Sequence, residues 1–272
     1  MKKKIAIQGF EGSFHQVAAL QFFRDVEVVC CSTFREVVKF ATDKKHDGGV
    51  MAIENSIAGS ILPNYNLLQK SNLKITGEIY LQVKQNLLVS PGIKLEDIRE
   101  VHSHPMALLQ CIEFLEKYNW KLIETDDTAL SAKHIHQHRS KHIAAIASRL
   151  AADLFNLEVL APNIHTLKYN YTRFLVVQHA DKAMPVEDAN KASLIFNTDH
   201  SKGSLAKVLS KIAEGDINLS KLQSMPIPGS DWKYSFHADL EFAGMDQFNT
   251  VIKNITPLTD DLKVYGIYKN GR

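Results

Sequence analysis

Short apolar runs alternate with amphipathic stretches along the first part of the chain. Residues 5–7, 26–29 and 49–53 are apolar runs of strand length, and helical patterns at 15–24 and 33–41 separate them. Strands that alternate with helices indicate an α/β domain with a largely parallel sheet. In such sheets ligands bind beside the carboxyl ends of the strands, so polar side chains at those ends are the first candidates for chemistry.

The same alternation continues to about residue 178, with further strands and helices of ordinary length. The additional strands are predicted at 81–90, 101–103, 120–124 and 143–147. The additional helices are predicted at 106–118, 128–138 and 149–155. The N-cap region of the second of these helices is Asp126-Asp127-Thr128.

The pattern changes after a polar segment at 179–190, which carries Pro185 and lacks apolar periodicity, as linkers do. The C-terminal residues then read as a compact βαββαβ unit, with strands at 192–197, 217–225, 233–242 and 262–268 and helices at 204–214 and 245–255. We therefore expect an α/β domain at 1–178, a linker at 179–190, and a ferredoxin-like domain at 191–272.

The composition is that of an ordinary globular protein. Hydrophobic residues make up 45% of the 272 residues, and the net charge of +2 comes from scattered lysines and arginines. Nucleic acid and membranes are therefore not expected partners, and no apolar run approaches the roughly 20 residues that span a bilayer. The three cysteines, Cys30, Cys31 and Cys111, do not form a disulfide framework. We expect a cytoplasmic protein in which they are small buried apolar side chains.

Two groups of polar residues follow predicted strands near the N-terminus. The turn Gly9–Phe14, which contains Ser13, opens a helix and could offer backbone N–H groups to an anion, but it lacks the nucleotide-binding fingerprints. Glu54, Asn55 and Ser56 come directly after the strand at 49–53. Helix capping is the alternative interpretation of these residues, and Ser60 is expected to cap the next helix.

Polar residues also follow the strand at 101–103. Ser103 and His104 suggest a nucleophile and a base, with Gln110 two turns further on. Adjacent residues of a strand face opposite ways, so these two side chains are not expected to pair, and a serine hydrolase is disfavoured. The histidines at 134, 136, 138 and 142 lack a metal-binding signature, so we interpret them as a solvated helix face and predict no metal site.

The sequence Asn170-Tyr171-Thr172-Arg173-Phe174 begins an apolar strand with a hydroxyl, a guanidinium and an aromatic ring. Such a strand would hold the three groups in fixed positions. An ion pair for Arg173 and a core position for Phe174 are the alternative interpretation.

In order along the chain, these motifs resemble those of the prephenate dehydratases. The matching stretches are Gly9–Phe14, Ile53–Ser56 with Gly59-Ser60, Ser103–Pro105 with Gln110 and Cys111, Asp127–Ala129, Ala144–Ser148 and Asn170–Phe174. The resemblance implies two α/β lobes of the type II periplasmic-binding kind, with the active site in the cleft between them. It also implies conversion of prephenate to phenylpyruvate, water and carbon dioxide without a metal or organic cofactor.

The resemblance implies roles for individual residues. Thr172 would donate a hydrogen bond or proton to the leaving hydroxyl, Arg173 would clamp the pyruvyl carboxylate, and Phe174 would supply an apolar wall. Three uncharged donors, Asn55, Ser103 and Gln110, would orient substrate oxygens. The expected supporting and substrate-binding residues are Ser13, Glu54, Ser56, His104, Asp126 and Thr128.

The C-terminal unit resembles the family's ACT regulatory domain, which binds phenylalanine. The family's G-A-L motif is matched by Gly203-Ser204-Leu205, whereas its E-S-R-P motif reads Gln223-Ser224-Met225-Pro226 and lacks the acid and the arginine. We expect the effector near Gly203–Leu205 and Asn218-Leu219, in a homodimer or homotetramer, with Gln223 and Met225 altering its binding. Arogenate dehydratase and a non-catalytic amino-acid sensor remain alternatives.

Overall fold

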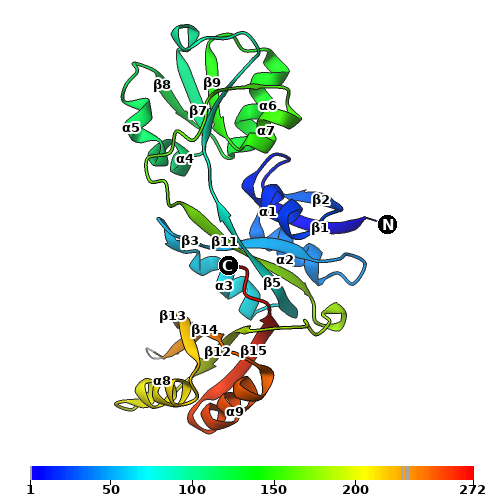
Figure 1. Ribbon diagram of the computed structural model, residues 1–272, viewed down its shortest axis with the longest axis vertical. Coiled ribbons are helices and arrows are strands. Elements are labelled where there is room, and N and C mark those ends of the chain that lie inside the picture. The colour runs from blue at the N-terminus through cyan, green and yellow to red at the C-terminus, as the bar shows by residue number, and fades with distance from the viewer. Residues whose placement is uncertain (1, 228, 231–232) are drawn as a thin grey trace. The chain divides into compact units, whose positions relative to one another are not determined.

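The computed structural model describes residues 2–227, 229–230 and 233–272, and its strands form three sheets (Figure 1). The chain divides into two compact units. The first holds residues up to Lys70 together with Ile79–Phe174, and the second holds Ser71–Glu78 together with Leu175–Arg272. The predicted mixed α/β composition is confirmed. The segment predicted as a linker contains a short 3-10 helix, η2 (Ala180–Lys182).

The first sheet has the strand order β2-β1-β3-β11-β5, with the short β4 beside β3. Its strands are β1 (Lys3–Gln8), β2 (Val26–Cys31), β3 (Gly49–Asn55), β4 (Gly59–Ser60), β5 (Leu73–Gln82) and β11 (Tyr171–His179). The helices that go with it are α1 (Phe14–Phe22), α2 (Phe34–Thr42) and α3 (Leu62–Gln69). As predicted, β1 lies parallel to both β2 and β3.

The expectation that Ser60 caps a helix is wrong. The side chain of Asn55 accepts hydrogen bonds from the N–H groups of Ile57 and Ala58, each at 2.9 Å. The chain therefore turns back on itself, and Ser60 pairs with Glu54 in the two-stranded hairpin of β3 and β4. The residue that precedes α3 is Ile61, which makes no side-chain cap.

The second sheet has the order β10-β6-β9-β7-β8. Its strands are β6 (Asn86–Val89), β7 (Glu100–Ser103), β8 (Lys121–Glu124), β9 (Ile143–Ala147) and β10 (Glu158–Ala161). Because β6 runs antiparallel to both β9 and β10, the largely parallel sheet that the sequence predicts is a mixed one here. The predicted helix at 106–118 is broken at Cys111 into α4 (Pro105–Gln110) and α5 (Ile112–Leu115).

Alternating side chains divide the core of this lobe between the two faces of the second sheet. Leu87 and Ile146 point toward α4 and α5, whereas Leu88 and Ala145 point toward α6 (Thr128–His138) and α7 (Arg149–Leu154). Figure 1 shows the two helix pairs on opposite sides of the sheet. The sheet is thus covered on both faces, as its nearly continuous apolar strands require.

The second unit contains a four-stranded antiparallel sheet with the order β13-β14-β12-β15. Its elements are β12 (Lys191–Asn197), α8 (Ser204–Glu214), β13 (Asn218–Pro226), β14 (Tyr234–Glu241), α9 (Met245–Ile255), η3 (Thr256–Leu258) and β15 (Asp260–Tyr268). The predicted βαββαβ order is confirmed. Both long helices cover the same face of the sheet, where Phe196, Val208 and Val251 belong to one apolar core (Figure 1).

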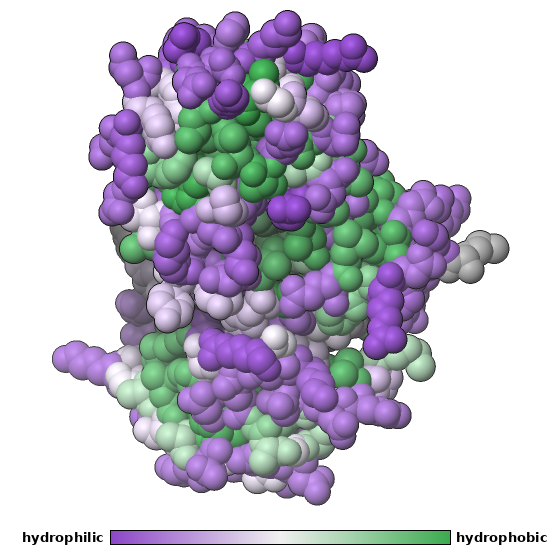
Figure 2. All heavy atoms as spheres, turned by 45° about the horizontal axis from the view of Figure 1, so that its top comes forward, coloured by the Kyte–Doolittle hydropathy of each residue, from purple (hydrophilic) through white to green (hydrophobic). Residues whose placement is uncertain are grey.

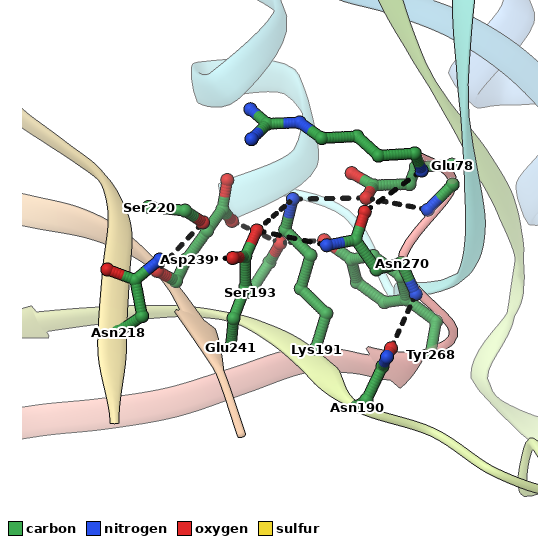
Figure 3. A network of polar contacts seen from close by, with 12 residues as sticks. Glu78, Asn190, Lys191, Ser193, Asn218, Ser220, Asp239, Glu241, Tyr268 and Asn270 are labelled. Carbon is green, nitrogen blue, oxygen red and sulfur yellow. Dashed lines mark hydrogen bonds and ion pairs between the residues drawn. The ribbon is translucent and has the colours of Figure 1, made fainter. Parts of the chain in front are cut away.

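The other side of this sheet carries a buried polar network, which Figure 3 shows. The Nζ atom of Lys191 lies 3.0 Å from Oε1 of Glu78 and 3.5 Å from Oε1 of Glu241. Glu78 reaches the network because the first half of β5 lies directly against β15 and the C-terminal tail. A Cβ atom on Gly266 would lie 2.0 Å from the carbonyl oxygen of Ile75, so only glycine permits this approach.

Hydrophilic residues cover most of the face shown in Figure 2, and apolar residues come to the surface between them in separate areas. Large exposed apolar side chains occur along the whole chain, among them Leu109, Leu154, Leu167 and Met184. Such scattered exposure is usual for protein surfaces. Within the described ranges, none of the helices is sufficiently long and apolar to pass through a bilayer.

The cysteines and the histidine-rich segment differ in how well the sequence predicts them. Cys31 and Cys111 are buried as expected, but Cys30 is exposed. The reason is that β2 is the edge strand of its sheet, so one of two adjacent cysteines points away from the core. The histidines at 134, 136 and 138 are exposed on α6, which agrees with a solvated helix face.

Candidate active site

A cavity of about 300 Å³ lies in the first unit, next to the ends of β1 and β3, the start of β11 and the first turns of α1, α4 and α6. It brings together many of the predicted site residues, which are Ser13, Asn55, His104, Gln110, Asp126, Thr128, Thr172 and Phe174. These residues come from distant parts of the sequence, and the folding of β3 beside β11 places them around one space.

The alternation of β11 decides which side chains face the cavity. Thr172 and Phe174 line it, whereas Arg173 between them does not. Arg173 is only 4% exposed, and its guanidinium carbon lies 5.9 Å from the ring centroid of Tyr80 on β5. This position does not suit the carboxylate clamp that the sequence suggested for Arg173, because a bidentate clamp must reach the substrate.

Asn55 and Thr172 form the polar edge of the cavity. Nδ2 of Asn55 lies 3.0 Å from Oγ1 of Thr172 and 2.8 Å from Oδ1 of Asn170. Since an amide nitrogen is a donor, the threonine oxygen accepts this hydrogen bond and keeps its own proton for another partner. The arrangement can therefore offer a positioned hydroxyl donor to a ligand in the cavity.

The glycine turn closes against the helices of the second sheet. Gly9 and Gly12 have φ values of +94° and +88°, which L side chains rarely adopt. A Cβ atom on Gly9 would lie 2.7 Å from Oδ2 of Asp127, and one on Gly12 would lie 2.9 Å from Cα of Ala151. Ser13 then caps α1 through its side chain. The turn thus needs glycine for its backbone and for its close packing.

His15 lies in the cavity wall, although no sequence motif pointed to it. Its ring contacts that of Phe174 edge to face at 4.9 Å and that of Phe34 at 5.4 Å, measured between centroids. Burial lowers the pKa of His15 to about 3, so the ring is neutral at pH 7. His15 therefore extends the uncharged wall that Phe174 begins.

The acidic residues of the cavity come from the start of α6. Asp127 caps this helix, because its Oδ1 accepts hydrogen bonds from the N–H groups of Ala129 and Leu130 at 2.7 and 2.9 Å. Burial raises the pKa of the Asp127 carboxyl, and these two hydrogen bonds oppose the rise. Among the described residues that line the cavity, none is a lysine or an arginine. An anionic ligand would therefore be held by uncharged donors.

Besides Arg173, three predicted site residues lie outside the cavity. Ser103 is fully buried, and its hydroxyl donates to the carbonyl oxygen of Ile146 at 2.7 Å, which ties β7 to β9. Ser56 accepts from the N–H of Tyr171 at 2.9 Å and so fixes the start of β11. Glu54 takes part in β3 and does not line the cavity. Ser103 therefore has a structural partner in place of the predicted substrate.

The predicted effector residues of the second unit do not gather at one place in the single chain. Ser204 and Leu205 line a cavity of about 380 Å³, and Gly203 precedes them with a φ of +81°. Asn218 instead donates to Oε2 of Glu241 at 3.1 Å in the polar network (Figure 3). Leu219 packs against the apolar core, Met225 is buried, and Gln223 bonds the carbonyl oxygen of Ser224.

Comparison with known proteins identifies the family. A family model described as prephenate dehydratase matches residues 5–182, which include every residue of the cavity wall. The chain belongs to the prephenate dehydratase family. A relative from Arabidopsis thaliana, named arogenate dehydratase/prephenate dehydratase 1, chloroplastic, is 33% identical over 98% of this chain and 72% of its own length. Membership of this family agrees with an enzyme that acts at the cavity described above.

Solved structures share the fold over nearly the whole chain. The structure of GqqA, described as a novel type of quorum quenching acylase, is 28% identical, with a TM-score of 0.89 and coverage of 98% of both chains. A prephenate dehydratase from Arthrobacter aurescens in complex with L-Phe is 23% identical, with a TM-score of 0.87 over 98% of this chain and 90% of its own. The family fold thus extends through both units of the chain.

Proposed function

We propose that the protein converts prephenate to phenylpyruvate, with Thr172 as hydrogen-bond donor to the leaving hydroxyl. The observation that carries this proposal is the 3.0 Å hydrogen bond in which Asn55 donates to the threonine oxygen. That bond fixes the hydroxyl at the cavity edge and leaves its proton for the substrate. Family membership and the location of both residues in the cavity wall support the same assignment.

The reaction needs few groups from the protein. The bond between the ring and its carboxylate breaks and its electron pair enters the ring, while the opposite carbon–oxygen bond breaks and the hydroxyl leaves. Prephenate and one proton thus give phenylpyruvate, carbon dioxide and water, and the new aromatic ring drives the reaction. A threonine hydroxyl is a weak acid, so Thr172 acts by stabilising the charge on the leaving oxygen, and solvent supplies the proton.

The uncharged wall suits the loss of carbon dioxide. Phe174 and the neutral ring of His15 face the cavity, and a carboxylate beside them lacks the stabilisation that water or a cation would give it. Gln110 and Thr128 supply uncharged donors for the remaining substrate oxygens. Arg173 supports β11 from its other face, through its contact with Tyr80. Asp126, His104 and Ser13 complete the edge of the site.

Turnover of prephenate by the purified protein at neutral pH tests the proposal. We expect phenylpyruvate to form in the presence of a metal chelator, and we expect Thr172→Ala to remove that activity. The mutant is the control for a contaminating dehydratase. Absence of turnover with the wild-type protein contradicts the proposal for prephenate.

Arogenate is the second candidate substrate, because the Arabidopsis relative carries both names. The two substrates differ only in an amino group and a keto group, so parallel assays of phenylalanine and phenylpyruvate formation separate them. A non-catalytic sensor would not need a threonine donor. An acylase activity like that named for GqqA finds little support in the cavity, since ring nitrogens of His15 and His104 accept from the backbone N–H groups of Ala52 and Met106.

We also propose that the second unit is an ACT-type regulatory domain that binds L-phenylalanine. Its βαββαβ order, the motif at Gly203–Leu205 and the fold shared with a structure in complex with L-Phe support this assignment. The catalytic domain would then occupy 1–178, in two lobes of the type II periplasmic-binding kind, with a linker at 179–190. Binding would occur between copies in a cytoplasmic homodimer or homotetramer, which would bring Asn218 and Leu219 to the motif.

Calorimetry with phenylalanine tests the regulatory proposal separately from catalysis. We expect weak binding, because Gln223 and Met225 stand where the family motif has an acid and an arginine. Sedimentation with and without phenylalanine would report the assembly. No heat of binding at millimolar phenylalanine would contradict the proposal, and the catalytic assignment would stand.

A further inference from the structure

A chain of side-chain amides runs along the wall of the proposed active site, and Asn170 lies at its centre. Asn170 is fully buried and does not itself line the cavity. Its Oδ1 lies 2.8 Å from Nδ2 of Asn55, and its Nδ2 lies 2.9 Å from Oε1 of Gln110. Both of these neighbours do line the cavity. Asn170 thus joins Asn55 and Gln110, two of the amides that line the cavity, and Gln85 in the same wall also donates to Oε1 of Gln110 over a longer distance of 3.4 Å.

The orientation of these three amides is fixed at Asn55. Oδ1 of Asn55 faces the backbone N–H groups of Ile57 and Ala58, each 2.9 Å away. Both of those groups are donors, so the oxygen and not the nitrogen of the Asn55 amide must point toward them. The nitrogen of Asn55 then points toward Thr172 and Asn170 as a donor. The tight turn after β3 therefore sets the orientation of this amide.

The orientation of Asn55 in turn sets the orientation of Asn170 and of Gln110. Because Asn55 donates, Asn170 must present its oxygen to Asn55, and its nitrogen then points toward Gln110. Gln110 in turn must present its oxygen to Asn170, which leaves its Nε2 group for another partner. Among the described residues, no hydrogen bond is made by that Nε2 group. A residue of the cavity wall is thereby oriented as a donor.

We propose that Asn170 is a positioning residue that holds Gln110 as a hydrogen-bond donor toward the substrate and Asn55 as a donor toward Thr172. The oxygens of a carboxylate or a keto group are acceptors, so a turned Gln110 amide would place oxygen against oxygen. This inference rests on the proposed function for the identity of the substrate. The orientation of the amides rests only on the hydrogen bonds within the protein.

Replacement of Asn170 by aspartate tests the orientation of the three amides. The new carboxylate still accepts from Asn55 but repels the Gln110 oxygen, so Gln110 turns its nitrogen toward the carboxylate and its oxygen toward the substrate. Protonation of the carboxyl at low pH restores a donor to Gln110. We expect Asn170→Asp to lower kcat/KM roughly 10- to 100-fold at pH 8, mostly through KM, and the deficit to shrink as the pH falls.

The double variant with Gln110→Ala separates positioning from a general structural defect. In that background Asn170→Asp has no amide to turn, so we expect it to cause less than a threefold further loss at any pH. A matched control is Asn64→Asp, which changes another buried amide of the first unit whose nitrogen donates to the Ala52 carbonyl oxygen at 2.7 Å. Its effect should be independent of Gln110. A loss from Asn170→Asp that is the same at every pH and independent of Gln110 overturns the proposal.

A measurement without turnover keeps this inference separate from the proposed function. Side-chain amide signals of Asn55 and Gln110 can be followed by nuclear magnetic resonance in the wild-type protein and in Asn170→Ala. We expect hydrogen exchange at the Asn55 amide to become at least tenfold faster in the variant, because one of its acceptors is lost. Unchanged exchange overturns the positioning role, whereas absent turnover of both substrates alone contradicts the proposed function.

Discussion

The buried pair of Lys191 and Glu78 offers a test of how the second unit is stabilised. The side chain of Lys191 is 1% exposed and that of Glu78 is 0% exposed, and Glu241 accepts from the same ammonium group at the edge of the network (Figure 3). Charges taken out of water need close partners, and the loss of one partner leaves the others with an uncompensated cost. We therefore expect substitutions within the pair to be strongly destabilising.

The geometry makes the two single substitutions unequal. Lys191→Met leaves two carboxylates beside an apolar side chain, so we expect it to lower the free energy of unfolding by about 3–5 kcal/mol. Glu78→Gln leaves the ammonium with Glu241, and its amide oxygen still accepts from the N–H of Gly271, so a loss of about 1–3 kcal/mol is expected. The double variant removes both charges, and its cost should be less than the sum by about 1–3 kcal/mol.

Urea denaturation followed by far-ultraviolet circular dichroism measures these losses, and hydrogen exchange assigns the affected transition to 175–272. The matched control is Lys211→Met on α8, where an exposed lysine pairs with Glu214 at the surface. Surface pairs contribute about 0–1 kcal/mol. If Lys191→Met costs no more than this control, or if the single losses are simply additive, the buried network does not stabilise the second unit through paired charges.

Three further predictions concern the first unit. The pKa of His15 is about 3 in the folded protein and 6.5 for an ordinary histidine, so only the unfolded state gains this proton as the pH falls below 6.5. In urea titrations, the free energy of unfolding of the wild type relative to His15→Gln should therefore drop by about 2 kcal/mol at pH 5. An equal dependence on pH in both proteins would contradict this. Gly59→Ala, at φ +82° with open space around it, should lower the free energy of unfolding by about 1–2 kcal/mol in thermal denaturation. Gly12→Ala, at φ +88° and packed against α7, should lower it distinctly more, and equal losses would contradict a role for this close packing. Arg173→Lys should lower stability by about 1 kcal/mol through its contact with Tyr80 and leave KM for prephenate within about threefold, whereas a tenfold higher KM would support the carboxylate clamp.

Most of the elements could be predicted from the sequence because local apolar periodicity reports strands and helices directly. The strand predicted at 81–90 is wrong, since these residues are divided between β5 and β6, and α3 and β10 were not predicted. The strands around Ile5, Val50 and Ile146 lie where their apolar runs predict them, and so do the helices capped by Ser13 and Asp127. The mixed direction of the second sheet could not be predicted, since apolar runs carry no information about which neighbour a strand pairs with.

The candidate site was only partly predictable. A polar stretch at the end of one strand identified Asn55, and another at the start of a strand identified Thr172. Membership of a motif does not say which way a side chain points. Ser103 and Arg173 lie in such motifs and face other parts of the protein. His15 reaches the cavity from the first turn of α1, in an ordinary helical pattern, so no local signal marks it.

The assembly of the second unit depended on a contact that no local pattern reveals. The βαββαβ order was visible, but the insertion of Ser71–Glu78 beside β15 was not. It rests on Gly266, whose missing side chain lets the carbonyl of Ile75 approach. A single glycine in a strand pattern indicates a close approach in general and does not name the partner.

The role of Thr172 is tested by the rate of phenylpyruvate formation from prephenate by Thr172→Val, compared with the wild-type protein. Valine keeps the shape of the side chain and removes only the hydroxyl that accepts from Asn55. With the fold verified by circular dichroism, we expect kcat/KM to fall by about 100-fold or more. A value within a few-fold of the wild type would contradict the assignment of Thr172 as the donor to the leaving hydroxyl.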